Sequence, residues 1–137
     1  MIYCDSSALV KLVVEEPESE ALDEWLSLQR GVQLTSSVLA RTEVVRAVGR
    51  YGEKWAAAAQ DLLTTVTVVE LDQTLADEAA LLGSPGLRTL DALHLASALR
   101  IEQAITAFVA YDHRLAEAAR SKGLQVIAPQ PGTAAGT

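Results

Sequence analysis

The stretch MIYCDSSALVK, residues 1–11, passes from a short apolar run into an aspartate, two serines and a helix-like segment. This run and four others rich in β-branched residues are typical of short strands, over residues 1–4, 32–35, 66–71, 107–111 and 125–128. Helical patterns fall over residues 9–14, 17–28, 36–50, 54–63, 73–82, 90–103 and 113–122. Strands that alternate with helices indicate a parallel sheet covered on both faces. We therefore predict a three-layer α/β/α fold around about five parallel strands.

The composition indicates one domain without a membrane span. A chain of 137 residues that is 50% hydrophobic can bury one compact core, which we assign to residues 1–128. Residues 129–137 have too little apolar content to pack, so we expect a flexible tail there. No run approaches the roughly 20 apolar residues of a membrane span, which favours a cytoplasmic protein. The single cysteine, Cys4, excludes an internal disulfide and a multi-cysteine metal site.

The net charge of −7 argues against a broad basic surface for nucleic acid, because such surfaces neutralise phosphates with Lys and Arg. The distribution weakens that argument. Six of the eighteen acids fall within residues 15–24, so the rest of the chain is nearly neutral. Arg46, Arg50 and Lys54 recur every four residues and are predicted to form one basic stripe on a helix. The stripe is either a nucleic-acid contact or a plain solvated face.

Two aspartates follow predicted strands directly. Asp5 ends the first strand, and Asp112 follows the fourth in the segment FVAYDHRL. In an open parallel sheet, sites form outside the carboxyl ends of the strands, where neighbouring loops leave a crevice. If the strand order is the common doubly wound 3-2-1-4-5, strands one and four are neighbours and both carboxylates project into one crevice. Each aspartate is also a suitable N-cap for the helix that follows it.

Two further acids lie in apolar helices. Asp91 lies in TLDALHLASAL and Glu43 in SSVLARTEVVRAV, where Ser36 or Ser37 is a suitable helix cap. An unpaired carboxylate in such a setting is costly. Asp91 is therefore expected near the helix start or beside a partner such as Arg88, and Glu43 has a possible partner in Arg46.

Convergence of these four acids would require a cation. Two carboxylates about 4 Å apart repel by roughly 4 kcal/mol at an effective dielectric near 20. Oxygen ligands without a His or Cys set favour Mg²⁺ or Mn²⁺ over zinc. Such ions hold a phosphoryl oxygen and lower the pKa of a bound water, which suits phosphate chemistry.

Four motifs in this order resemble the PIN-domain family, and within it the VapC-type ribonuclease toxins of toxin–antitoxin pairs. They are MIYCDSSALVK (1–11), RTEVVRA (41–47), LRTLDALHLASAL (87–99) and VAYDHRL (109–115). The resemblance runs from Met1 to about residue 128. It implies an endoribonuclease that hydrolyses RNA phosphodiesters with Mg²⁺ or Mn²⁺.

By motif match, the family's four metal-binding and catalytic acids are Asp5, Glu43, Asp91 and Asp112. The resemblance implies that Glu43 is either a ligand or the group that orients and deprotonates the attacking water. Ser6 is a hydroxyl in the family's expected place. Family members often carry Thr or Ser two residues before the fourth acid, where this chain has Ala110. A hydroxyl contact near the metal is therefore expected to be missing.

The family also implies partners: an RNA substrate, a small VapB-like antitoxin and a second copy of the chain in a homodimer. Trp25 and Trp55 are candidates for these interfaces, although ordinary core packing is the favoured explanation for both. Arg88 and Arg114 flank two of the acids and are candidates, with Ser6, for RNA contact.

Three other residues have simpler explanations. His94, in the apolar segment LHLA, is expected to be a hydrogen-bonded core histidine, and His113 is expected to be exposed. Cys4 precedes Asp5 and so points to the opposite face of the strand, as a small buried hydrophobe.

Three competing functions fit the sequence less well than the ribonuclease does. An aspartate-based phosphatase of the haloacid-dehalogenase type needs a second acid two residues after the first, where this chain has Ser7. A phospho-acceptor receiver domain needs an acidic pair after the first strand and a lysine late in the sheet, which Cys4-Asp5 and the segment QVIAP do not supply. A catalytically silent PIN-fold interaction protein is favoured only by Ala110.

Overall fold

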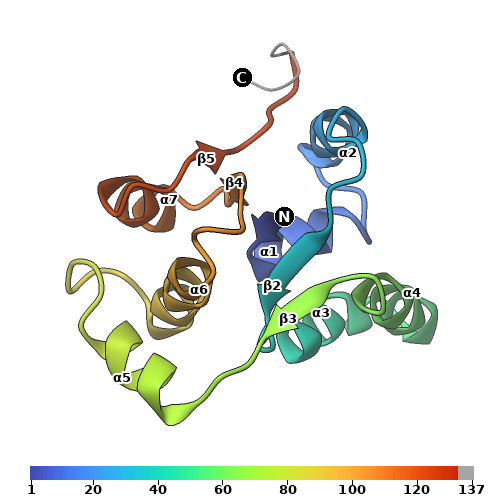
Figure 1. Ribbon diagram of the computed structural model, residues 1–137. Helices are drawn as coiled ribbons and strands as arrows, with labels where there is room; N and C mark the ends of the chain where they lie inside the picture. The colour runs from blue at the N-terminus through green and yellow to red at the C-terminus, as the bar shows by residue number, and fades with distance from the viewer. Residues whose placement is uncertain (133–137) are drawn as a thin grey trace.

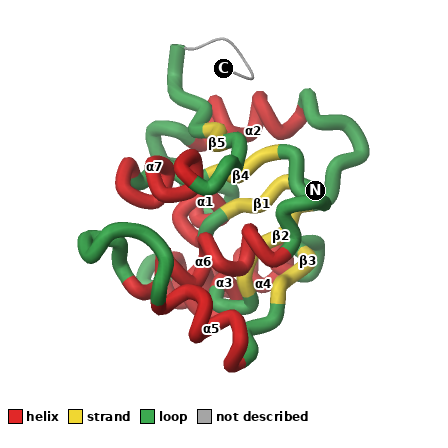
Figure 2. The backbone as a smooth tube through the Cα atoms, turned by 60° about the vertical axis from the view of Figure 1, so that its left-hand side comes forward, coloured by secondary structure: helices red, strands yellow, loops and turns green. Residues whose placement is uncertain are grey.

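The central sheet contains five parallel strands. The computed structural model describes residues 1–132 (Figure 1). Its strands are β1 (Ile2–Cys4), β2 (Leu34–Ser37), β3 (Thr67–Val69), β4 (Ala107–Val109) and β5 (Val126–Ile127). They pair in the order β3-β2-β1-β4-β5, which Figure 2 shows edge to edge. This is the common doubly wound order that the convergence of Asp5 and Asp112 requires, and the predicted three-layer parallel α/β fold is confirmed.

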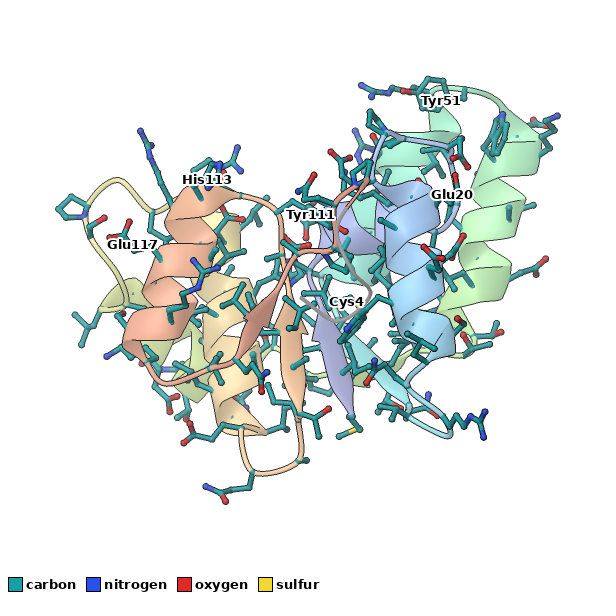
Figure 3. The ribbon with its side chains drawn as sticks, turned by 90° about the horizontal axis from the view of Figure 1, so that it is seen from above. Cys4, Glu20, Tyr51, Tyr111, His113 and Glu117 are labelled. Atoms are coloured by element: carbon teal, nitrogen blue, oxygen red, sulfur yellow. The ribbon has the colours of Figure 1, made fainter. Side chains whose placement is uncertain are left out.

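Seven helices within residues 1–132 cover the two faces of the sheet. They are α1 (Ser6–Lys11), α2 (Ser19–Ser27), α3 (Ala40–Gly49), α4 (Glu53–Leu63), α5 (Gln73–Ala80), α6 (Thr89–Arg100) and α7 (His113–Ser121). Helices α1 to α4 lie on one side of the sheet and α5 to α7 on the other, as the view from above shows (Figure 3). Every predicted helix is present with its ends shifted by a few residues.

Strand β1 lies at the centre of both cores because its side chains alternate between the two faces. Ile2 and Cys4 pack into the cluster formed with α1 to α4. Tyr3 points the other way, where its ring stacks on Phe108 with 5.3 Å between centroids. Cys4 is fully buried, as predicted, and burial followed by the charge of Asp5 raises the pKa of its thiol well above the ordinary value.

The prediction that Ser36 or Ser37 caps a helix is wrong. Both residues belong to β2, and α3 begins only at Ala40. Two serines fit a buried strand because their hydroxyls find partners there: Ser36 Oγ donates to the Cys4 carbonyl at 2.6 Å, and Ser37 Oγ accepts from the Leu39 amide at 3.1 Å.

The predicted basic stripe is also wrong. Arg46 lies on α3 and Lys54 on α4, and the chain turns between the helices at Gly52, whose φ of +130° is open only to glycine. Lys54 lies over the ring of Trp55, which packs half-buried against the core. Trp25 is buried, so the core-packing explanation holds for both tryptophans.

The C-terminal segment begins with a contact to the site end of the sheet. The Tyr111 hydroxyl donates to the Pro129 carbonyl at 2.9 Å. The predicted domain boundary at residue 128 stays a prediction, and residues 133–137 of the predicted tail lie outside the described residues. No helix within residues 1–132 has the length and apolar character needed to cross a membrane.

Candidate active site

The four predicted acids line one pocket of about 400 Å³. The pocket lies at the carboxyl ends of β1 and β4, which are neighbours in the sheet. Its lining residues are Asp5, Ser6, Ser7, Lys11, Glu43, Arg88, Asp91, His94, Tyr111 and Asp112. A larger pocket of about 630 Å³ lies between α5 and α6, but it contains none of the predicted site residues. We therefore take the acid-lined pocket, called the acidic cleft below, as the candidate active site.

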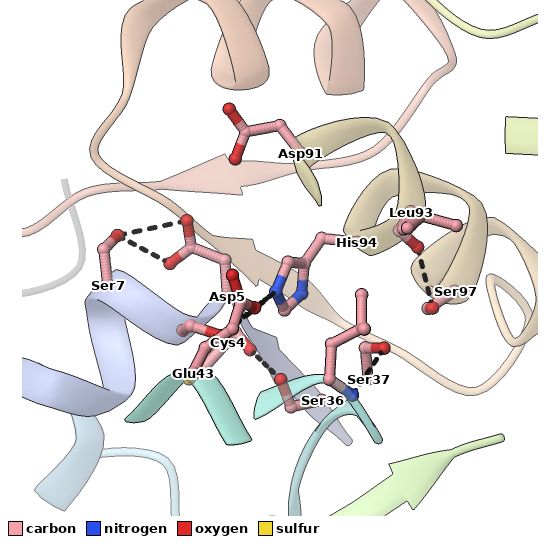
Figure 4. A network of polar contacts seen from close by, with 12 residues as sticks. Cys4, Asp5, Ser7, Ser36, Ser37, Glu43, Asp91, Leu93, His94 and Ser97 are labelled. Carbon is pink, nitrogen blue, oxygen red and sulfur yellow. Dashed lines mark hydrogen bonds and ion pairs between the residues drawn. The ribbon is translucent and has the colours of Figure 1, made fainter. Parts of the chain in front are cut away.

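Asp5 is the most deeply buried of the four acids, with 4% of its surface exposed. It follows β1 directly and caps α1, accepting the Ala8 amide at 2.9 Å. The Ser7 hydroxyl contacts both carboxylate oxygens, at 2.9 and 3.1 Å (Figure 4). Burial is the main cause that raises the pKa of Asp5, and the charge of Asp91 raises it further. The hydrogen bonds from Ala8 and Ser7 and the electrostatic effect of His94 lower it, but they do not outweigh burial. The cap and the cleft carboxylate are therefore the same group.

Glu43 reaches the cleft from the first turn of α3. Its Oε1 accepts from Ser6 Oγ at 2.7 Å and from His94 Nε2 at 2.8 Å (Figure 4). Burial would raise the pKa of Glu43, but the contacts with His94 and Ser6 outweigh it, so the pKa lies below its ordinary value. The side-chain partner of Glu43 is thus His94, and not Arg46 as sequence reasoning had offered.

His94 is a site residue that sequence reasoning missed. It is 2% exposed and hydrogen-bonded, as predicted, but its partners are Glu43 and Ser6 on the cleft side and Tyr3 behind. The signal was available: a histidine inside an apolar run needs a buried polar partner. His113, by contrast, is exposed at the start of α7, as expected (Figure 3).

Asp91 and Asp112 lie at the N-terminal ends of α6 and α7, with Arg88 between them. Arg88 Nε lies 3.1 Å from Asp91 Oδ2, and its Nη2 lies 3.9 Å from Asp112 Oδ2. Asp91 lies in the first turn of α6, as predicted, with 14% of its side chain exposed. Asp112 caps α7 by accepting the Leu115 amide at 2.9 Å and is 40% exposed. The Arg88 side chain is 73% exposed, so it can leave this position without disturbing the core.

Two more cations border the cleft. Lys11 lines it, and its Nζ contacts Glu18 at 2.9 Å and Glu16 at 3.2 Å. Arg114 donates to the Gly86 carbonyl at 3.3 Å and lines a smaller pocket of about 150 Å³ that shares Arg88, Asp91 and Asp112 with the cleft. The acids therefore have positive groups at their margin.

The donor chemistry of the cleft fits a hard divalent cation. All four acids offer carboxylate oxygens, which Mg²⁺ and Mn²⁺ prefer. Among residues 1–132, no three His, Cys, Asp or Glu side chains already lie close enough to hold one ion together. Glu43 is turned towards His94, and Asp91 towards Arg88. A cation in the cleft would therefore compete with Arg88 for Asp91.

Ala110 lies away from the cleft lining. It is fully buried in the apolar cluster with Tyr3, Leu95 and Phe108. Two hydroxyls lie in the cleft next to the first acid: Ser7 donates to Asp5, and Ser6 donates to Glu43.

A doubly wound parallel sheet with carboxylates gathered at the switch point between β1 and β4 defines an α/β protein with its candidate site at the carboxyl ends of the strands. The chain belongs to the PIN-domain family, whose model matches residues 2–121. It is of the VapC type: Ribonuclease VapC47 of Mycobacterium tuberculosis is 41% identical over 132 residues, covering 94% of this chain and 97% of the relative.

Solved structures share the fold. VapC20 of Mycobacterium tuberculosis, a toxin that cleaves the sarcin–ricin loop, has a TM-score of 0.71 at 18% identity, over 90% of this chain and 96% of that one. The VapBC2 complex of Rickettsia felis, bound to a DNA fragment from its promoter, has a TM-score of 0.70 at 15% identity, over 95% of this chain and 100% of that one. At these identities the likeness shows the fold.

Proposed function

We propose that this protein is a metal-dependent endoribonuclease that acts as the toxin of a VapBC-type toxin–antitoxin pair. The observation that carries the proposal is the gathering of four carboxylates, from four separated motifs, in one cleft. A relative that is 41% identical over almost the whole chain is a ribonuclease.

The metal in this proposal is Mg²⁺, with Mn²⁺ as a substitute, held by Asp5, Asp91 and Asp112, with Glu43 as a further ligand or as the base. The ion would polarise the phosphoryl oxygen and make a bound water acidic. Asp5 supports this assignment because its burial disfavours the charged form, and a nearby cation would offset that cost.

The chain's own residues would orient the substrate and move the proton. Glu43 is kept ionised by His94 and Ser6, so it can accept the proton of the attacking water. Arg88 and Arg114 would contact the phosphates on either side of the scissile bond, and Ser6 is a further candidate for RNA contact. Because Arg88 is exposed, it can turn from Asp91 to a phosphate.

The partners in this proposal are an RNA substrate, a cognate VapB-like antitoxin and a second copy of the chain in a homodimer, all within the cytoplasm. The Rickettsia felis neighbour was solved as a VapBC complex, which supports an antitoxin partner here. The acidic segment of residues 15–24 offers a surface to which basic antitoxin side chains would be attracted.

The test is cleavage of a mixed cellular RNA pool by the purified protein with Mg²⁺, with Mn²⁺ or with a chelator. We expect metal-dependent cuts that disappear in Asp5→Ala and Asp91→Ala, while both variants stay folded by circular dichroism. Asp72→Ala is the matched control, since Asp72 caps α5 outside the cleft lining, and it should cut RNA like the parent.

Three outcomes would contradict the proposal. Cleavage by Asp5→Ala and Asp91→Ala at the parent's rate would remove the site assignment. Absence of cutting by folded protein that still binds Mn²⁺ would favour the silent interaction protein. Release of phosphate from a small ester would favour the phosphatase, although the Ser7 hydroxyl contacts Asp5 where that mechanism needs an acid.

A further inference from the structure

A chain of hydrogen bonds leads from the core to the acidic cleft through His94. The Tyr3 hydroxyl lies 2.8 Å from His94 Nδ1, and His94 Nε2 lies 2.8 Å from Glu43 Oε1. Tyr3 is fully buried and His94 is 2% exposed, so water does not compete for these contacts. The imidazole ring is held edge-on to the Tyr3 ring, at 80° between planes.

The partners fix which nitrogen of His94 bears the proton. An ionised Glu43 can only accept, and the Ser6 hydroxyl already gives its proton to Oε1 at 2.7 Å. Nε2 must therefore carry a proton and donate it to Glu43. In the neutral ring Nδ1 then bears no proton and can only accept. The Tyr3 hydroxyl, 2.8 Å away, is therefore its donor.

These contacts also orient the carboxylate. Both donors, Ser6 and His94, meet the same oxygen, Oε1. Among the hydrogen bonds of residues 1–132, none reaches Oε2. A glutamate side chain has three rotatable torsions. Two fixed donors on one carboxylate oxygen restrict its rotamer and leave the other oxygen available to the cleft.

We infer that His94 is a positioning residue for Glu43, and that Tyr3 holds His94 in the Nε2–H form that can do this. The inference rests on the proposed ribonuclease function and adds to it two residues of the β1 and α6 core. His94 itself touches neither the substrate nor the reacting atoms in this arrangement.

Tyr3→Phe is the sharpest test, because it removes one hydroxyl and keeps the ring stacked on Phe108. Outer partners of ligating or catalytic groups typically contribute tenfold to a hundredfold. We expect kcat for RNA cleavage to fall about tenfold or more with KM nearly unchanged. His94→Asn, which can still place a donor near Glu43, should retain more kcat than His94→Ala. Tyr51→Phe, which removes an exposed hydroxyl, is the matched control and should cleave at the parent's rate.

Nitrogen-15 NMR of the imidazole rings gives a readout that does not depend on activity. The chain has two histidines, so a His113→Gln variant assigns the His94 signals. We expect the proton of His94 on Nε2 in the parent and an exchange between the two tautomers in Tyr3→Phe. A parent with the proton on Nδ1 alone, or a Tyr3→Phe variant with the parent's kcat and tautomer, would overturn the inference.

Failure of this inference and failure of the ribonuclease proposal are distinguishable. If the parent does not cut RNA, the ribonuclease proposal fails, while the tautomer measurement still decides whether Tyr3 sets the state of His94. If the parent cuts RNA and the Tyr3→Phe and His94 variants cut equally well, only the positioning role is lost.

Discussion

Asp5 shows how one side chain serves both the fold and the site. As an N-cap it accepts the Ala8 amide, which is one of the free donors at the start of α1. As a buried carboxylate it is disfavoured in its charged form. The cap needs only an oxygen, whereas metal binding needs the charge. The two roles can therefore be separated by a substitution that keeps the oxygen and removes the charge.

Asp5→Asn should abolish cleavage and stabilise the protein at neutral pH. Burial raises the folded-state pKa of Asp5 above its ordinary 3.8, so the protonated form is favoured in the fold. The free energy of unfolding that protonated Asp5 contributes is fully present below the ordinary pKa and is lost as pH rises through the folded-state pKa. Every tenfold difference in proton affinity corresponds to about 1.4 kcal/mol. Thermal denaturation in chelator should show Asp5→Asn above the parent at pH 7, with the gap closing near pH 4.

Glu43→Gln is the contrasting variant, because the pKa of Glu43 is lowered in the fold. A lowered pKa contributes stability that is present above the ordinary pKa and is lost as pH falls through the folded one. Glu43→Gln should therefore melt below the parent at neutral pH, with the gap closing in acid. If both variants shifted the melting temperature in the same direction at pH 7, the electrostatic account of the cleft would be wrong.

At the scale of elements, aspartates begin three of the helices in the same way. Asp5, Asp72 and Asp112 each accept the amide three residues later, in α1, α5 and α7. Two of these helix starts lie in the cleft and one lies outside it. The fold therefore supplies its own control for the site.

Asp112→Asn should keep the stability of α7 and lose cleavage, because Asn caps a helix about as well as Asp. Asp112→Ala should lose cleavage and also about 1 kcal/mol of folding free energy. Asp72→Ala should destabilise the fold and cut RNA like the parent. Urea denaturation and cleavage rates, measured together for the three variants, check this. An active Asp112→Asn would remove Asp112 from the site.

Arg88 connects the starts of α6 and α7 through the charges of Asp91 and Asp112. In Arg88→Gln the acids lose this competing cation, so we expect Mn²⁺ to bind more tightly, by up to about fivefold for an exposed pair. RNA binding should weaken at the same time, because a phosphate contact is lost. Arg100→Gln is the control, since Arg100 pairs with Asp72 away from the cleft. Titration calorimetry with Mn²⁺ measures the first effect; weaker Mn²⁺ binding would contradict it.

At the scale of the molecule, the sequence predicted what local patterns determine. Short apolar runs between helices indicated a parallel sheet. The acids at the strand ends converge because parallel strands present their carboxyl ends on one edge and because β1 and β4 are neighbours. The missed features depend on distant contacts. Ser36 belongs to a strand because it donates to Cys4, 32 residues away, and His94 contacts Glu43 across 51 residues. A window of ten residues contains neither partner.

The same convergence makes metal binding a property of the whole fold. The four acids lie at the end of β1, in α3, in α6 and at the start of α7. The unfolded chain therefore has no site, and a bound ion stabilises only the folded state. At one hundred times the dissociation constant, such a ligand adds about 2.7 kcal/mol. For a chain of this length we expect Mn²⁺ to raise the melting temperature by about 10 °C. Asp5→Asn and Asp91→Asn should lose this shift, and Asp72→Asn should keep it. An equal shift in Asp5→Asn would place the ion outside the acidic cleft.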